Sequence, residues 1–116
     1  MKVSEELRAA LAEAGARLHA RFPLWLRPFL MRDVIGITLG SRIYLSPRVA
    51  AMPPAHAERL IRHELAHVRQ IRRLGLLRFL WRYGLEYVRH RRAGLSSAAA
   101  YDAISFEQEA RAAEGT

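Results

Sequence analysis

Apolar side chains recur every three or four residues near the start of the chain, at Leu7, Leu11, Ala14 and Leu18. This spacing predicts an amphipathic helix over residues 5–20. Ser4 stands before it, and a serine there can accept a hydrogen bond from an unpaired amide of the first turn. Pro23 and Pro28 then interrupt the pattern, so we expect the apolar residues 22–32 to form a loop or a short helical turn.

Residues 34–46 show the pattern of a β-hairpin. Val34–Leu39 and Arg42–Leu45 are rich in β-branched and aromatic side chains, and Gly40-Ser41 lies between them. A glycine at the first position of a two-residue connection fits a type II′ turn. An exposed edge of this hairpin could bind an extended peptide by backbone pairing, or the hairpin could simply cover the core, and both interpretations stay open.

Helical periodicity returns over residues 55–73, 76–92 and 97–114. In the first of these stretches Glu64 and His67 lie on the apolar arc, and the arginines lie opposite. Residues 76–92 carry apolar side chains that we expect to pack into the core, at Leu77, Leu80, Trp81, Leu85 and Val88. Ser105–Gln108 matches a capping box and predicts an interruption of the last stretch near Ile104. The chain is therefore expected to be a mostly helical α+β domain.

The residues most informative about chemistry are His63-Glu64-Leu65-Ala66-His67, an H-E-x-x-H motif within a predicted helix. Positions i and i+4 share one helix face, so both imidazoles can bind one metal ion. The chain has no cysteine, so any metal must be held by His, Asp or Glu. Zinc lowers the pKa of a bound water toward neutrality, and Glu64 is placed to accept the proton as a general base. The motif on an apolar face favours metal ligation, because unpaired polar groups are costly to bury.

A catalytic zinc site needs a third protein ligand. The residue six positions after His67 is Arg73, which excludes the metzincin pattern. Asp102 has no supporting motif, and His90 lies among arginines that would oppose a cation. We favour Glu107, beside a small residue that permits close helix packing, with Glu109 as the second choice. Tyr83, Tyr87 and Tyr101 are candidates for an oxyanion donor, although each fits a packing role as well.

The H-E-x-x-H motif, followed by Phe106-Glu107-Gln108-Glu109-Ala110, resembles the gluzincin metallopeptidases. The compact layout is similar to that of minigluzincins, in which a helix, a β-ribbon, an active-site helix and a glutamate-bearing helix follow one another. The resemblance implies a single zincin-like domain over residues 1–116, with Zn2+ bound by His63, His67 and Glu107 and with Glu64 as the catalytic base. Many gluzincins carry an acidic residue just after the alanine, whereas this chain has Arg111.

The net charge of +8 gives the chain an affinity for polyanions. The arginines of residues 76–92 could contact nucleic acid or an anionic membrane, but a helix packed on the core with a solvated arginine face is the favoured interpretation. No apolar signal segment or membrane span is apparent, so we expect a cytoplasmic protein with a peptide or protein substrate.

Two other functions remain as alternatives. The chain could be a zinc-binding adaptor with little or no catalysis, or a basic protein that binds nucleic acid or a membrane surface and carries the motif by accident. Bound zinc would separate the last of these from the other two. Loss of activity with zinc retained on Glu64→Gln would separate a peptidase from an adaptor.

Overall fold

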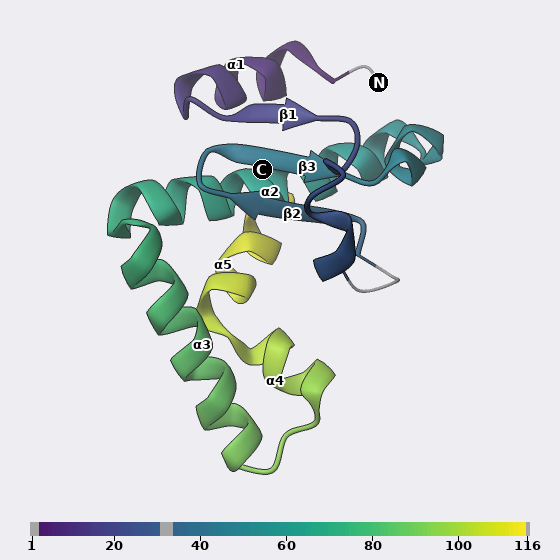
Figure 1. Ribbon diagram of the computed structural model, residues 1–116. Coiled ribbons are helices and arrows are strands. Elements are labelled where there is room, and N and C mark those ends of the chain that lie inside the picture. The colour runs from purple at the N-terminus through teal and green to yellow at the C-terminus, as the bar shows by residue number, and fades with distance from the viewer. Residues whose placement is uncertain (1–2, 31–33, 116) are drawn as a thin grey trace.

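A computed structural model of the chain describes residues 3–30 and 34–115. The helices of this part are α1 (Glu5–Glu13), α2 (Pro54–Leu74), α3 (Leu76–Arg92), α4 (Ser97–Ala103) and α5 (Ser105–Ala113). Its strands are β1 (Arg17–His19), β2 (Gly36–Leu39) and β3 (Arg42–Leu45), and its 3-10 turns are η1 (Arg27–Phe29) and η2 (Pro47–Ala51). The prediction of a mostly helical α+β fold is confirmed (Figure 1).

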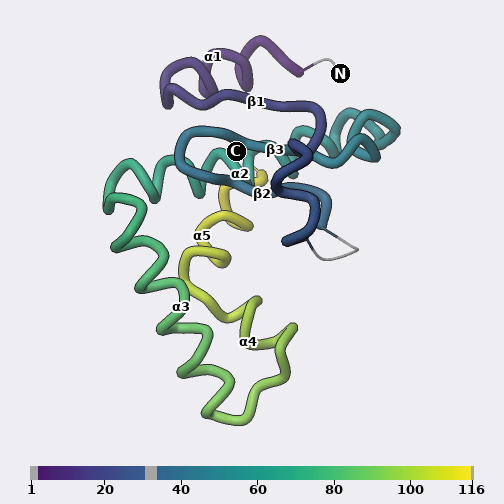
Figure 2. Tube along the Cα trace, viewed as in Figure 1, coloured from purple at the N-terminus to yellow at the C-terminus, as the bar shows by residue number. Residues whose placement is uncertain are grey.

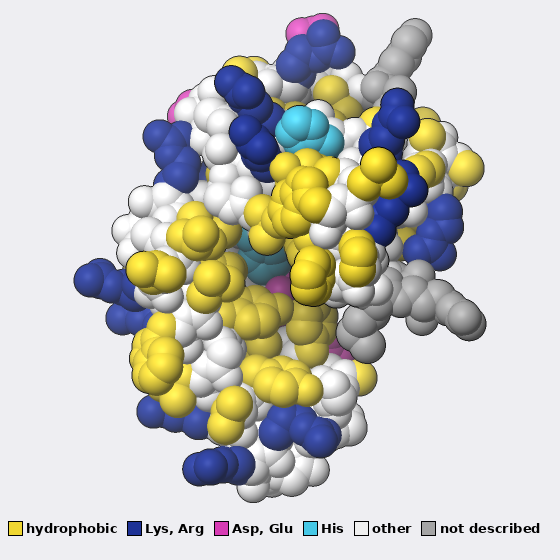
Figure 3. Space-filling view, viewed as in Figure 1, with side chains coloured by type: hydrophobic (Ala, Val, Ile, Leu, Met, Phe, Trp, Pro, Cys, Tyr) yellow, Lys and Arg dark blue, Asp and Glu magenta, His cyan; other side chains and the backbone are white. Residues whose placement is uncertain are grey.

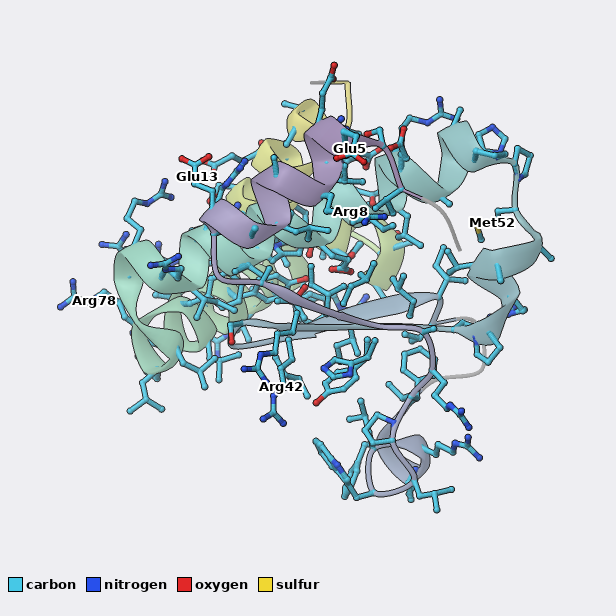
Figure 4. All side chains as sticks on the ribbon, turned by 90° about the horizontal axis from the view of Figure 1, so that it is seen from above. Glu5, Arg8, Glu13, Arg42, Met52 and Arg78 are labelled. Atoms are coloured by element: carbon cyan, nitrogen blue, oxygen red, sulfur yellow. The ribbon has the colours of Figure 1, made fainter. Side chains whose placement is uncertain are left out.

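The strands of the described residues form one sheet in the order β1-β3-β2. β2 and β3 are the predicted antiparallel hairpin, while β1 runs parallel to β3 and leaves β2 at an edge. Gly40 has a φ of +63°, whereas Ser41 does not have a positive φ. A positive φ at the first central residue alone fits the expected type II′ turn. Seen from above, α1, α2 and α5 lie on one side of the sheet and the turn η1 on the other (Figure 4).

The first predicted helix is only partly correct, because α1 ends at Glu13 rather than near residue 20. Gly15 takes the left-handed conformation with a φ of +67°, and the amide of Ala16 donates to the carbonyl of Leu11 at 2.9 Å. This Schellman motif ends the helix and frees Leu18 to join the sheet. The predicted cap is present, since Ser4 Oγ accepts from the Leu7 amide. The loop or short helical turn predicted for residues 22–32 is confirmed by η1. Residues 31–32 of that segment lie outside the described part.

Helix α2 is the centre of the molecule and matches the predicted helical stretch closely. Its apolar face packs with α1, β3 and η2 around a core of fully or almost fully buried side chains, Leu7, Leu11, Ile43, Leu45, Val49, Ile61, Leu65 and Val68. α5 lies against the next face of α2 and runs back toward the sheet from the end of α4 (Figure 2). The H-E-x-x-H segment of α2 is thus held between the sheet and α5.

Helices α3 and α4 form an arm that extends away from the sheet (Figure 1). The expected core packing of α3 is wrong. Phe79 is the buried residue of this fully described helix, whereas Leu77, Trp81 and the other predicted core positions are exposed. Tyr83 and Tyr87 turn inward instead, because a polar aromatic can reach hydrogen-bond partners on α4 and α5. In the described part of the chain, no helix is both long and apolar enough to cross a membrane.

The predicted interruption before α5 is observed, but the capping box is not. Ile104 stands at the N-cap and offers no side-chain oxygen. The amide and hydroxyl of Ser105 instead donate to the carboxylate of Glu86 on α3, at 2.8 and 2.7 Å. The start of α5 is therefore fixed by the neighbouring helix, and this contact helps to place Glu107, which lies in the same first turn.

Candidate metal centre

His63, His67 and Glu107 converge where α2 and α5 cross. The Glu107 carboxylate lies 2.8 Å from His63 Nε2 through Oε1 and 3.2 Å from His67 Nε2 through Oε2. One potential ligand atom from each residue lies within 4.8 Å of the other two, and among the described residues this is the group that could hold a metal ion. The three residues that the sequence singles out are thus brought to one point.

The orientation of His67 is fixed by Gln70, which is fully buried. The Gln70 amide nitrogen donates to the carbonyl of Phe106 and to Glu109 Oε1, each at 3.0 Å. Its Oε1 must therefore face His67 Nδ1, which donates to it at 2.9 Å. Since the Nδ1 proton is committed to Gln70, the Nε2 lone pair of a neutral His67 points toward Glu107 and is free for a metal ion.

His63 is held in the same way, by a carboxylate. Its Nδ1 donates to Glu114 Oε2 at 2.7 Å, and its Nε2 faces Glu107. A carboxylate on the outer nitrogen of a histidine ligand fixes the ring and raises its basicity. Both imidazoles therefore present Nε2 to the same point.

The electrostatics of the site match a place for a cation. Burial lowers the pKa of His63 and His67, but hydrogen bonds with Glu107 and with Glu114 or Gln70, together with the charges of Glu64 and Glu107, outweigh it and hold each pKa above its usual value. For Glu107, burial raises the pKa, but hydrogen bonds from the two histidines and Tyr83 hold that pKa well below its usual range. Without metal, protons occupy the space between Nε2 and the carboxylate. A divalent cation satisfies the same lone pairs, so the donor set of two imidazoles and one carboxylate fits zinc.

Glu64 is buried beside this centre. Thr38 Oγ1 on β2 donates to its carboxylate at 3.0 Å. Gly36, also on β2, leaves room for this carboxylate, because an added Cβ would meet Glu64 Oε1 at 3.4 Å. Burial raises the pKa of Glu64, although the neighbouring histidines and Thr38 oppose that rise. A carboxyl whose pKa is raised toward neutrality is better suited to exchange a proton with substrate.

The three tyrosines have different positions. Tyr83 donates to Glu107 Oε2 at 2.6 Å, and Tyr87 bonds to Ser97 at 2.9 Å. Tyr101 lines the space beside Glu64, and partial burial together with Glu107 raises its pKa, so it stays protonated. Tyr83 and Tyr101 both line the space beside Glu64 and Glu107, and the Tyr83 hydroxyl is already bonded to Glu107.

Two adjoining hollows meet at Glu64. One, of about 560 Å³, extends past Arg59, His63 and Glu114. The other, of about 330 Å³, lies between the edge strand β2 and α3 and is mostly apolar, with Leu39, Phe79 and Leu80 in its wall. Figure 3 shows this second hollow, with histidine and acidic side chains at its base and hydrophobic side chains around it.

The other residues considered as ligands lie elsewhere. Glu109 bonds to Gln70 and pairs with Arg73 at 3.7 Å, so it supports His67 from outside the centre. Asp102 is exposed and pairs with Arg111 at 3.5 Å. His90 lies in the last turn of α3, near the far end of the arm. The supporting roles of Gln70 and Glu114 were not predicted, although Gln70 lies one turn after His67 on α2 and Glu114 lies two turns after Glu107.

Residues 33–75 match the family model of the eCIS core domain, a domain of extracellular contractile injection system proteins that is often zincin-like. The match covers less than half of the chain. It includes β2, β3 and α2 with the whole H-E-x-x-H motif, and it ends before Glu107. No curated protein and no solved structure matches the chain. The chain thus contains a region similar to the eCIS core domain with a candidate His-His-Glu metal site, whose third member comes from outside that region.

Proposed function

We propose that the protein is a zinc-dependent peptidase of the gluzincin type, with His63, His67 and Glu107 as the metal ligands. The observation that carries this proposal is the convergence of both Nε2 atoms on the Glu107 carboxylate, while each Nδ1 is bound by an outer partner. Two Nε2 atoms and a carboxylate that meet at one point, with each ring held through its other nitrogen, are the arrangement that a metal site requires. A site with three ligands from two helices also leaves a position open for substrate.

Zinc bound there would polarise a substrate carbonyl and lower the pKa of water. Glu64 then acts as the general base: it takes a proton from the attacking water and delivers it to the leaving amine. Thr38 holds the Glu64 carboxylate on the open side of the site. The Tyr101 hydroxyl, still protonated at neutral pH, is the donor best placed to stabilise the developing oxyanion.

The two hollows give an extended peptide a path across Glu64. β2 is an edge strand, and several of its residues line the apolar hollow that faces α3. A peptide that adds to this edge would run past the catalytic carboxylate with alternate side chains pointing into the hollow. This favours the interpretation of the hairpin as a substrate-binding edge.

The test is cleavage of a mixed library of unstructured peptides by the wild-type protein and by Glu64→Gln. We expect Glu64→Gln to keep its zinc and to lose activity by about 100-fold or more, since general-base contributions are of that order. Glu6→Gln, at an exposed position on α1 outside the site, is the matched control and keeps most of the activity. Cleavage that is unchanged in Glu64→Gln would contradict the proposal. A zinc-bound wild-type protein that cleaves nothing would instead indicate a zinc-binding interaction module.

A further inference from the structure

The outer face of α3 exposes a continuous apolar stripe. Leu77 is 82% exposed, Trp81 72% and Val88 46%, and Leu85 lies between them at 36%. Positions 77, 81, 85 and 88 are spaced by three or four residues, so they form one stripe along the helix. The buried Phe79 lies well away from this stripe, on the side that faces the body of the molecule. Nothing in the described part of the chain covers the apolar stripe.

A stripe of arginines runs beside the apolar one. Arg78, Arg82 and Arg89 follow the same spacing on the adjacent side of α3, and Arg78 points away from the molecule (Figure 4). Glu86 is the single acidic residue of this helix, and Ser105 engages both of its oxygens. The outer surface of the arm therefore combines leucine, valine and tryptophan with a net positive charge.

We propose that α3 docks on an anionic lipid surface. A helix with leucine and tryptophan on one side and arginines beside them is the kind that lies in the membrane interface. Tryptophan favours that depth because its ring is apolar while its N–H remains hydrated. A second copy of the chain is a poorer occupant, because its own arginine stripe and net charge of +8 would be repelled.

This docking is independent of the proposed peptidase activity. The α3 face lies outside the metal centre, and no residue of the stripe contacts His63, His67 or Glu107 in the hydrogen bonds and ion pairs of the site. The two proposals can therefore fail separately.

The experiment is co-sedimentation of the full chain with vesicles of phosphatidylcholine, with and without phosphatidylglycerol. We expect binding to the mixed vesicles and little to phosphatidylcholine alone. In a Trp25→Phe protein, Trp81 is the remaining tryptophan, and its emission shifts to shorter wavelength on binding. Arg78→Gln with Arg82→Gln weakens binding by about 30-fold, and Leu77→Ser with Val88→Ser by about tenfold or more.

The matched control is Leu24→Ser with Phe29→Ser, which removes apolar side chains that are 76% and 80% exposed in and near η1. This variant keeps its affinity for the mixed vesicles, and circular dichroism checks that every variant is folded. Failure to bind mixed vesicles overturns the proposal. Binding that survives Leu77→Ser with Val88→Ser also overturns it, as does dimerisation in solution that these two substitutions abolish, because the stripe would then serve a second copy.

Discussion

At the scale of single residues, the site depends on side chains that do not belong to the H-E-x-x-H motif. Gln70 holds His67, Glu114 holds His63 and Thr38 holds Glu64, and each of these bonds measures 3.0 Å or less. Such partners set which nitrogen carries the proton and where each ring points. The geometry of the centre is therefore a property of α5 and β2 as much as of α2.

Glu114→Gln tests the support of His63. The amide keeps the size of the side chain but removes the charge that makes the histidine a stronger ligand. We expect zinc affinity to fall by about 10- to 100-fold, with little change in the thermal stability of the metal-free protein. Competition with a chromophoric chelator measures the affinity. His90→Ala is the control, and equal zinc affinity in Glu114→Gln and wild type would show that Glu114 has no positioning role.

The sequence predicted the two histidines and the favoured glutamate but not their supporting residues. H-E-x-x-H has fixed spacing within one helix, so helix geometry alone places both imidazoles together. Glu107 required a judgement about packing between helices, which the small Ala110, fully buried in the structure, made possible. The contact of Glu114 with His63, and the bonds to α5 that orient Gln70 toward His67, depend on how α2 and α5 cross, and no local pattern specifies that crossing.

At the scale of elements, β2 sets the space that is available to Glu64. The Gly36 position lies against this carboxylate, with Glu64 Oε1 and Leu45 Cδ2 both 3.4 Å from an added Cβ. We expect Gly36→Val to displace the Glu64 carboxylate and to lower kcat by about tenfold or more while zinc remains bound. Steady-state kinetics with parallel zinc analysis makes the measurement. Unchanged kcat would show that Glu64 can move without cost.

The contact between α3 and α5 gives a second prediction at this scale. Glu86→Ala removes the acceptor for the Ser105 amide. The Glu86 carboxylate takes the place that an N-cap side chain has in other helices. We expect a loss of about 1 kcal/mol in the free energy of unfolding and weaker zinc binding, because the first turn of α5 carries Glu107. Chemical denaturation measures the loss. Glu5→Ala, on the outer side of α1, is the control and leaves zinc binding unchanged.

The ends of α2 and α3 were predicted well, whereas the end of α1 at Gly15 and the buried face of α3 were not. Gly75 and Gly94 mark the ends of α2 and α3 as expected, because both take positive φ. Leu18 fits helical spacing and strand alternation equally, so only its pairing with Ile43 decides that β1 forms. On α3 the spacing of an apolar stripe in the sequence is the same whether the stripe faces a core or solvent. That helix packs through Phe79 and its tyrosines, and sequence periodicity could not distinguish the two sides.

At the scale of the whole molecule, the titratable side chains of the site make the stability of the folded state depend on pH. Without metal, the raised pKa values of His63 and His67 stabilise the folded state below the usual histidine range, and this contribution is lost as pH rises through the folded values. The raised pKa of Glu64 acts in the same direction. The lowered pKa of Glu107 stabilises the fold above the usual carboxyl range and is lost as pH falls. The metal-free protein should therefore be most stable in mildly acidic solution.

Zinc should reverse this trend, because protons compete with the metal for the same nitrogens. We expect the Tm of the chelator-treated protein to fall from mildly acidic to mildly alkaline pH, and that of the zinc-bound protein to rise over the same range. Thermal melts followed by circular dichroism make this comparison. Parallel pH profiles with and without zinc would contradict the assignment of these histidines as ligands.

The proposed activity depends on one metal ion held by two imidazoles of α2 and one carboxylate of α5. The most direct test is elemental analysis of the protein purified without an affinity tag, together with Glu107→Ala and the control Asp102→Ala. We expect one zinc per chain in the wild type and in Asp102→Ala, and a large loss of zinc in Glu107→Ala. A wild-type protein free of zinc after equilibration with the ion, or a zinc content that Glu107→Ala leaves unchanged, would contradict it.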